Sequence, residues 1–239
     1  MTCSQTATAT AIDPTQAIGQ IAVALPGATA IFRRLKLDYC CGGQISLQQA
    51  VRNKELEIDP VMAELTTLQR GETTSRFESA AELIDHILVR YHDTHRAQLP
   101  ELIALAKRVE AVHRDHPAVP AGLAALLGEI QKDLLQHMQK EEQVLFPVLK
   151  AGGNPFVIQP IGIMRSEHVE HGANLERLAA LTDDMTAPPD ACTTWNALYA
   201  GIRQLGEDLI NHIHLENNVL FPQFEISTET PADGGPYDS

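Results

Sequence analysis

The sequence predicts an all-α protein in which a small helical domain precedes an up-down four-helix bundle. Two features of the sequence support this fold class. Four long segments after residue 79 carry apolar residues spaced alternately by three and four positions, as in helices that bury one face. No convincing run alternates apolar with polar residues over the length of a β-strand. The 239 residues suffice for one large domain, or for a small domain and a medium one.

Residues 11–70 are expected to form the small helical domain. Pro26 opens one short helix in "PGATAIFRRLKL", because proline is favoured in a first helical turn. Ser46 opens another in "SLQQAVRNKEL", where Gln49 follows three residues later as in a capping box. The polar stretch "RGETTSRFES", residues 70–79, reads as a connector, and all ten histidines of the chain follow it. We therefore place the domain boundary there.

Residues 79–225 are expected to form the bundle. Each of its four segments carries two polar residues, histidine or glutamate, within its apolar stripe. The stripes are Ile84, Leu88, His92, His95, Leu99 and Leu102; Leu123, Leu127, Ile130, Leu134, His137, Glu141, Val144 and Val148; Met164, His168, His171, Leu175 and Leu178; and Leu198, Ile202, Leu205, Leu209, His212, Glu216 and Val219. Their histidines and glutamates should point towards a shared axis. The tail, residues 226–239, is polar and rich in Pro and Gly, which predicts disorder.

One motif occurs twice, as "DLLQHMQKEEQVLFP" and "DLINHIHLENNVLFP", with 8 of 15 positions identical. His92 lies 45 residues before His137, and His168 lies 44 residues before His212. These spacings indicate two helical hairpins related by internal duplication. The bundle should therefore have a pseudo-two-fold axis.

The inward polar residues predict a pair of metal ions. A buried carboxylate needs a counter-charge, and the stripes contain no Lys or Arg. Any single histidine on an apolar face is more often a hydrogen-bonded core residue, but four imidazoles with two carboxylates favour two transition-metal ions. The stripes lack the cysteines of many structural zinc sites. Only Glu110 and His113 show the Glu-x-x-His spacing that occurs twice in ferritin-like di-iron proteins.

The repeated "HMQKE" and "HIHLE" are similar to the hemerythrin-like, or HHE cation-binding, domains. These two motifs occur together with "LDYCCGG", "RYHDTHRAQLPEL" and "ACTTW". With this combination of motifs, the chain resembles the RIC family, the repair of iron centres proteins. The resemblance implies a hemerythrin-like bundle with two non-haem iron ions, expected to be oxo-bridged. The implied metal ligands are His92, His137, Glu141, His168, His212 and Glu216, with both glutamates bridging.

The resemblance further implies a stress-response protein that repairs iron–sulfur clusters damaged by nitric oxide or peroxide. Its partners would be damaged iron–sulfur proteins, and its di-iron site would donate iron. A nitric oxide or peroxide reductase and an oxygen or nitric oxide sensor are the alternatives, so enzymatic activity stays open. Adjacent Cys40 and Cys41, followed by two glycines, suggest an exposed turn for iron or electron transfer and favour the repair function. A turn with two inert cysteines is the alternative.

Other polar residues near the stripes have less defined roles. His95 and His171 each lie one turn from an implied ligand, which suggests a supporting or gating role. His113 follows His92 by 21 residues, so it should lie about 31 Å away along one helix. Asp133 and Asp208, four residues before His137 and His212, could contact those histidines or simply meet water.

Composition and termini set the remaining expectations. A formal net charge of −13 opposes nucleic acid as a partner. No signal peptide or membrane span is recognisable, and four cysteines are too few for a disulfide scaffold, so a cytoplasmic protein is expected. A homodimer is compatible with the sequence, which does not define the oligomeric state.

Overall fold

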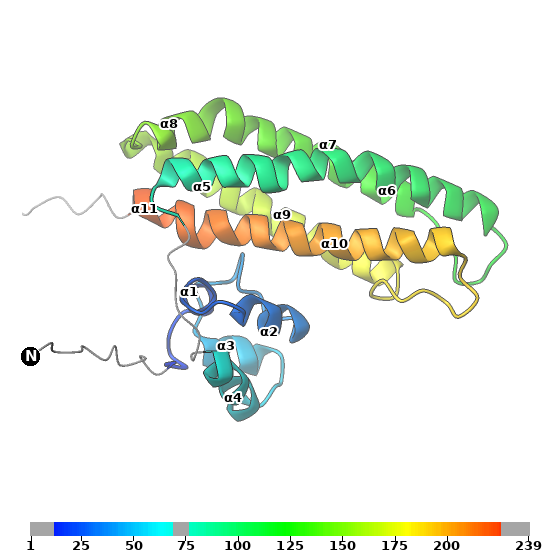
Figure 1. Cartoon of the computed structure of the whole chain (residues 1–239), viewed down its shortest axis with the longest axis horizontal. Helices are drawn as coiled ribbons and strands as arrows, with labels where there is room; N and C mark the ends of the chain where they lie inside the picture. The colour runs from blue at the N-terminus through cyan, green and yellow to red at the C-terminus, as the bar shows by residue number, and fades with distance from the viewer. Residues whose placement is uncertain (1–11, 69–76, 226–239) are drawn as a thin grey trace, which may run out of the picture.

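The computed structural model describes residues 12–68 and 77–225, and these residues form helices joined by turns and loops. Figure 1 shows two parts, a group of short helices and a long bundle. The described ranges contain no strand, only an isolated bridge between Ala17 and Ser46. The predicted all-α fold is therefore confirmed. The tail predicted to be disordered, and most of the predicted connector, lie outside the described residues.

The small domain contains α1 (Ile18–Ala24), α2 (Ala28–Arg34), α3 (Leu47–Asn53) and α4 (Ile58–Leu68). Its core includes Phe32, Tyr39 and Leu47, each at most 1% exposed. The predicted cap is confirmed, because the Ser46 side chain accepts a hydrogen bond from the Gln49 backbone N–H at 3.3 Å. The sequence pattern identified α2 and α3 but did not single out α1 and α4.

Four helical segments form the bundle. They are α5–η1–α6 (Ala80–Ile87, Leu88–His92, Asp93–Val112), α7–η2–α8 (Leu123–Lys140, Glu141–Leu145, Phe146–Lys150), α9 (Ile158–Leu181) and α10–η4–α11 (Thr193–Leu215, Glu216–Leu220, Pro222–Glu225). A 3-10 turn, η3 (Pro155–Val157), leads into α9. In Figure 1 the segments lie along one long axis, with α6 and α9 running one way and α7 and α10 running back. The segments therefore alternate in direction.

Two apolar clusters fill the bundle, and the inward polar residues lie between them. One cluster includes Leu134, Leu209 and Trp195. The other includes Leu145 and Leu220, which follow Glu141 and Glu216 along their helices. The core of the bundle is thus divided by a polar layer.

Each of the segments α5–η1–α6, α7–η2–α8 and α10–η4–α11 contains a π-helical turn at a predicted ligand. His92 ends η1, Glu141 begins η2 and Glu216 begins η4. The wide turns η2 and η4 are closed by backbone N–H groups of Phe146 and Phe221, which donate to the carbonyl oxygens of the two glutamates. Such turns add one residue to an α-helix and are frequent at functional sites.

The residue added by the π turn η2 shifts the buried face of the helix by one position beyond Glu141, so the predicted stripe does not continue there. Val144 was expected to point inward but is 60% exposed, and Val148 is only half-buried. Leu145 and Leu149 are buried instead, at 3% and 1% exposure. The prediction was wrong because it assumed an uninterrupted α-helix, in which the spacing of three and four residues never changes.

The small domain contacts the bundle through the turn at Tyr39 to Gly43. Asn218 Nδ2 donates to the Tyr39 carbonyl oxygen at 3.1 Å, and Asn217 Nδ2 donates to the Cys40 carbonyl oxygen at 3.0 Å. A Cβ atom at Gly43 would lie 2.5 Å from the Tyr39 carbonyl oxygen and 2.9 Å from Asn218 Oδ1. The second glycine of "YCCGG" is thus required for this close contact.

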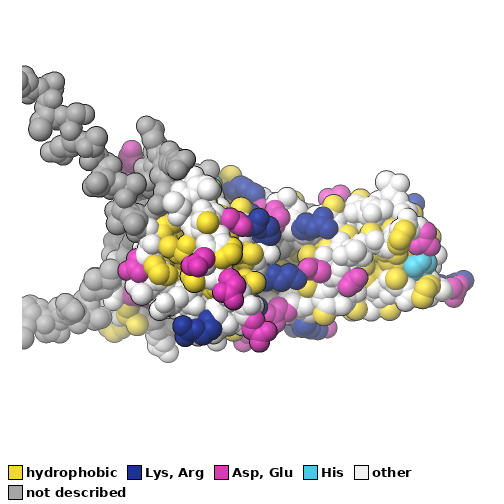
Figure 2. Space-filling model, turned by 90° about the horizontal axis from the view of Figure 1, so that it is seen from below, with side chains coloured by type: hydrophobic (Ala, Val, Ile, Leu, Met, Phe, Trp, Pro, Cys, Tyr) yellow, Lys and Arg dark blue, Asp and Glu magenta, His cyan; other side chains and the backbone are white. Residues whose placement is uncertain are grey.

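Among the described helices, none combines the length and the apolar character needed to cross a membrane. Figure 2 shows acidic and basic side chains interspersed over the face that includes the small domain. That nucleic acid is not a partner stays a prediction.

Candidate metal centre

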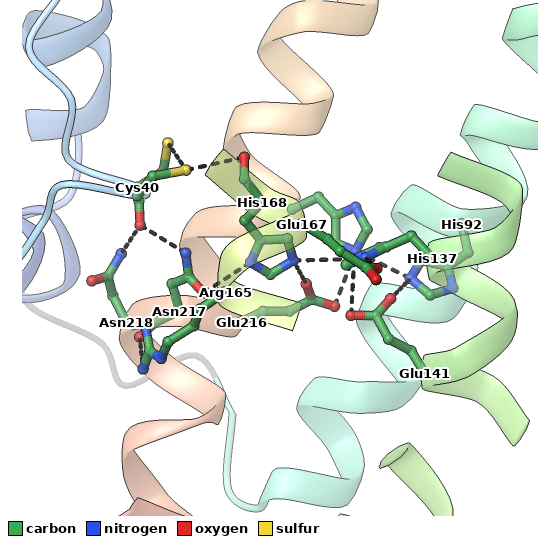
Figure 3. A network of polar contacts seen from close by, with 12 residues as sticks. Cys40, His92, His137, Glu141, Arg165, Glu167, His168, Glu216, Asn217 and Asn218 are labelled. Atoms are coloured by element: carbon green, nitrogen blue, oxygen red, sulfur yellow. Dashed lines mark hydrogen bonds and ion pairs between the residues drawn. The ribbon is translucent and has the colours of Figure 1, made fainter. Parts of the chain in front are cut away.

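The six side chains predicted as ligands meet in the polar layer of the bundle. They are His92, His137, Glu141, His168, His212 and Glu216, and none is more than 1% exposed. Figure 3 shows His137 and His168 directed towards Glu141 and Glu216. The pairs His137 with Glu141 and His212 with Glu216 are each four residues apart, so each pair lies on one helical face.

The six residues form two groups that share both glutamates. His92 and His212 belong to one group, and His137 and His168 belong to the other. Within each group, one ligand atom per residue lies within 4.8 Å of the others. The two histidines of each group face each other through Nε2, at 3.1 Å in both groups. Each group therefore takes one histidine from each predicted hairpin.

Each carboxylate directs one oxygen to each group. Glu141 Oε1 lies 3.2 Å from His137 Nε2, and Glu141 Oε2 lies 3.4 Å from His92 Nε2. Glu216 Oε2 lies 3.0 Å from His168 Nε2, and Glu216 Oε1 lies 3.0 Å from His212 Nε2. This is the arrangement expected of carboxylates that bridge two cations.

The charges of this site also favour cations. Both oxygens of Glu141 and Oε2 of Glu216 are buried, and none makes a geometrically good hydrogen bond within the described residues. Burial and the neighbouring Glu216 raise the pKa of Glu141. Burial is the largest single influence on His137 and lowers its pKa, but Glu141, Glu216 and Glu167 together raise that pKa to about 9. The site therefore attracts positive charge, and its nitrogen and oxygen donors suit iron.

Three of the four histidines are oriented by an acceptor at the other ring nitrogen. His92 Nδ1 lies 2.7 Å from Glu142 Oε1, and His137 Nδ1 lies 2.9 Å from Glu167 Oε2. His168 Nδ1 lies 2.9 Å from Asn217 Oδ1. An ionised carboxylate can only accept, so His92 and His137 donate from Nδ1 and direct Nε2 towards the centre.

These three partners were missed by the sequence analysis, although a signal was present. Glu142, Glu167 and Asn217 each stand directly beside a predicted ligand in the chain. A residue next to an inward ligand on a helix points about 100° away from it, towards a neighbouring helix. A polar side chain at such a position can reach the ligand of that neighbouring helix.

The two aspartates considered as partners do not contact these histidines. Asp133 is exposed, which agrees with the alternative that it meets water. Asp208 is buried but binds Arg90, whose Nη2 donates to Oδ1 at 2.6 Å, and it also accepts from Gln98 and Gln204. Nδ1 of His212 has no hydrogen-bond partner within the described residues.

The three other histidines considered in the sequence analysis, His95, His113 and His171, separate into two kinds. His113 lies at the C-terminal end of α6 with its Nε2 3.2 Å from Cys192 Sγ, outside both groups. His95 and His171 are buried beside the centre but belong to neither group. Burial is the largest cause that lowers the pKa of His95 to about 2 and the pKa of His171 to about 3.

The double-cysteine turn packs against the bundle at the backbone of α9 and is not fully exposed. Cys40 and Cys41 are partly buried at the bundle, so the expected exposed turn was wrong in this respect. The Cys41 thiol lies 3.4 Å from the carbonyl oxygen of His168 (Figure 3). Hydrogen bonding with Cys41 and burial raise the pKa of Cys40 well above its usual value. Asp38, Cys40 and Cys41 place one donor atom each within 4.8 Å of one another.

Comparisons with known proteins agree with both parts of the chain. Residues 83–224 match the hemerythrin HHE cation binding domain, and residues 14–69 match a domain of unknown function, DUF542. The chain is similar to the iron-sulfur cluster repair protein YtfE of Escherichia coli O1:K1, Escherichia coli strain SMS-3-5 and Escherichia fergusonii. Each is 50% identical over 210 residues, which cover 87% of this chain and 96% of the relative.

Proposed function

The chain belongs to the hemerythrin HHE family and to the family of iron–sulfur cluster repair proteins, and on this premise we propose that it repairs damaged clusters by supplying iron from a di-iron centre. The relatives are named for cluster repair, and the similarity extends over nearly their whole length. The observation that carries the di-iron part is the position of Glu141 and Glu216, whose four oxygens are divided evenly between two histidine pairs.

In this proposal, His92 and His212 bind one iron, His137 and His168 bind the other, and both glutamates bridge. An oxo bridge between the ions stays a prediction. Bound iron supplies redox activity and open positions for small ligands such as nitric oxide or oxygen. Glu142, Glu167 and Asn217 keep three of the imidazoles in place through Nδ1. Arg96 and Lys140 form ion pairs with Glu142 and Glu167, which limits the negative charge around the centre.

Cys40 and Cys41 are proposed to receive iron on its way to a damaged client. Their thiols lie beside His168, and with Asp38 they form a second group of possible metal donors. A thiol binds iron after losing its proton, and the raised pKa of Cys40 keeps the free thiol protonated. Binding at the turn therefore requires that the arriving cation displaces protons from the thiols.

The two alternatives from the sequence predict different behaviour. A nitric oxide or peroxide reductase would consume many equivalents of its substrate while it keeps its iron. A sensor would bind oxygen or nitric oxide reversibly without either reaction. The second group of donors at Asp38, Cys40 and Cys41, which contacts the His168 backbone, favours iron donation, because neither alternative needs such a group.

The test is to incubate the iron-loaded chain with a dehydratase whose iron–sulfur cluster has been damaged. Recovered dehydratase activity should rise as the chain loses iron, and it should exceed the recovery given by an equal amount of free ferrous iron. The metal-free chain is the control. Recovery no better than that with free iron would reject iron donation, and sustained consumption of nitric oxide in a parallel assay would favour the reductase.

Damaged iron–sulfur proteins are the partners in this proposal. The cytoplasmic location and the homodimer stay predictions.

A further inference from the structure

Two buried imidazoles beside the centre, those of His95 and His171, have no hydrogen-bond partner among the described residues. His95 is 0% exposed and His171 is 3% exposed, and neither ring nitrogen of either residue is bonded within the described residues. Both rings contact a proposed ligand, with centroid distances of 5.5 Å from His95 to His212 and 4.9 Å from His171 to His137. Each proposed metal position therefore has one unpaired imidazole next to it.

Both imidazoles approach the centre from the side opposite to the glutamates. His95 and His171 follow His92 and His168 by one turn in α6 and α9, which run in the same direction (Figure 1). Glu141 and Glu216 follow His137 and His212 by one turn on segments that run the other way. The carboxylates thus occupy one side of the histidine layer along the bundle axis, and His95 and His171 occupy the other.

A packing role alone does not account for these residues. A leucine at either position would fill the stripe, whereas a buried imidazole without partners loses its hydrogen bonds to water. Beyond them lie the apolar Leu99 and Leu178, which are buried and offer no polar contact. No side chain of the described residues pairs with these imidazoles, so their N–H groups are available to a water or a small ligand beside the metal positions.

The charge of the centre indicates the class of that ligand. Two ions of charge +2 or +3 exceed the charge of two carboxylates, so the loaded centre is positive and attracts anions. A neutral imidazole carries one N–H donor, so each of the two residues can donate one hydrogen bond to an anion. We propose that His95 and His171 form the ligand-binding side of the centre and donate hydrogen bonds to a small anion bound there. This inference rests on the proposed di-iron centre.

Azide is the probe, because it is a short linear anion whose iron complexes absorb visible light. The iron-loaded full chain would be titrated with azide and compared with His95→Leu, His171→Leu and the double variant. His113→Leu is the matched control, since it removes an imidazole 18 residues further along the same helical segment. Each single variant should weaken azide binding about tenfold, as expected for one lost hydrogen bond. His95→Gln, which keeps an N–H donor, should recover part of the affinity.

Iron content and stability separate the outcomes. All variants should keep the iron content of the wild type, and the metal-free leucine variants should unfold at a higher temperature than the metal-free wild type. Unchanged azide affinity in the double variant, with iron retained, would reject the inference and leave the di-iron proposal intact. Loss of one iron in a single variant would also reject it, because the residue would then be a ligand. A wild type that holds no iron would reject both proposals.

Discussion

The thiol of Cys41 donates a hydrogen bond to the carbonyl oxygen of His168 at 3.4 Å, so the small domain touches a residue proposed to bind metal. Asn217 forms a second link, because it accepts from His168 Nδ1 and donates to the Cys40 carbonyl oxygen. The conformation of the turn and the position of the imidazole are therefore coupled.

Asn217→Ala should weaken iron binding about 10- to 100-fold, the usual effect of removing a partner that orients a metal-bound histidine. Competition with a coloured iron chelator measures this change. Asn218→Ala is the control, because Asn218 contacts the same turn but none of the six predicted ligands. Equal iron affinities in the two variants would contradict the role assigned to Asn217.

The double change Glu141→Leu and Glu216→Leu should remove the coupled iron pair and its charge-transfer absorption. The metal-free variant should be more stable than the metal-free wild type, because two buried carboxylates without cations are costly. Iron analysis and thermal unfolding provide the two measurements. Glu170→Leu, an exposed site on α9, should keep the iron. Two coupled irons in the double variant would exclude bridging by these glutamates.

Replacement of Cys40 and Cys41 by serine should leave the iron spectrum and helical content unchanged, since no predicted ligand comes from the small domain. Cluster repair should slow or stop in the dehydratase assay. Unfolding stability should change by about 1 kcal/mol or less, because serine is close to cysteine in size. A variant that repairs at the wild-type rate would show that the turn is not the route of iron.

Removal of iron by a chelator should destabilise the bundle. A ligand present at 100 times its dissociation constant stabilises the folded state by about 2.7 kcal/mol, which corresponds to a shift of roughly 5–10 °C in Tm for a domain of this size. Differential scanning calorimetry of the loaded and chelated protein measures the shift, and added iron should reverse it. Identical melting curves would mean that the folded centre does not bind iron.

Deletion of Gln143 should convert η2 into an ordinary α-helical turn. Leu145 and Leu149 would then follow Glu141 at the spacing of a regular stripe, so helical content should be retained. Iron content should fall, because the wide turn begins at Glu141 and helps to set its direction. Gln143→Ala keeps the length of the turn and should keep the iron. A deletion variant with full iron content would show that the π turn is not needed for iron binding.

The sequence predicted the inward residues well because periodicity identifies the buried face of a helix. It placed His92, His137, His168 and His212 in the buried stripes of four helices, the resemblance singled them out as ligands, and the structure brings them together. It could not predict the change at Val144, since a π turn alters the hydrogen bonding of the backbone without a distinct local pattern. The sequence also could not predict the contact between Cys41 and His168, because that contact depends on how the two domains pack.

Each group of histidines takes one member from each hairpin, and this division has an evolutionary consequence. A single hairpin supplies one histidine to each of the two groups and one of the two shared glutamates, which is half of each group. An ancestral chain of one hairpin could have built this centre only as a two-fold symmetric dimer. Gene fusion would then have joined the two copies, and the different neighbours of His92 and His168 would have arisen afterwards, when the halves no longer shared one sequence.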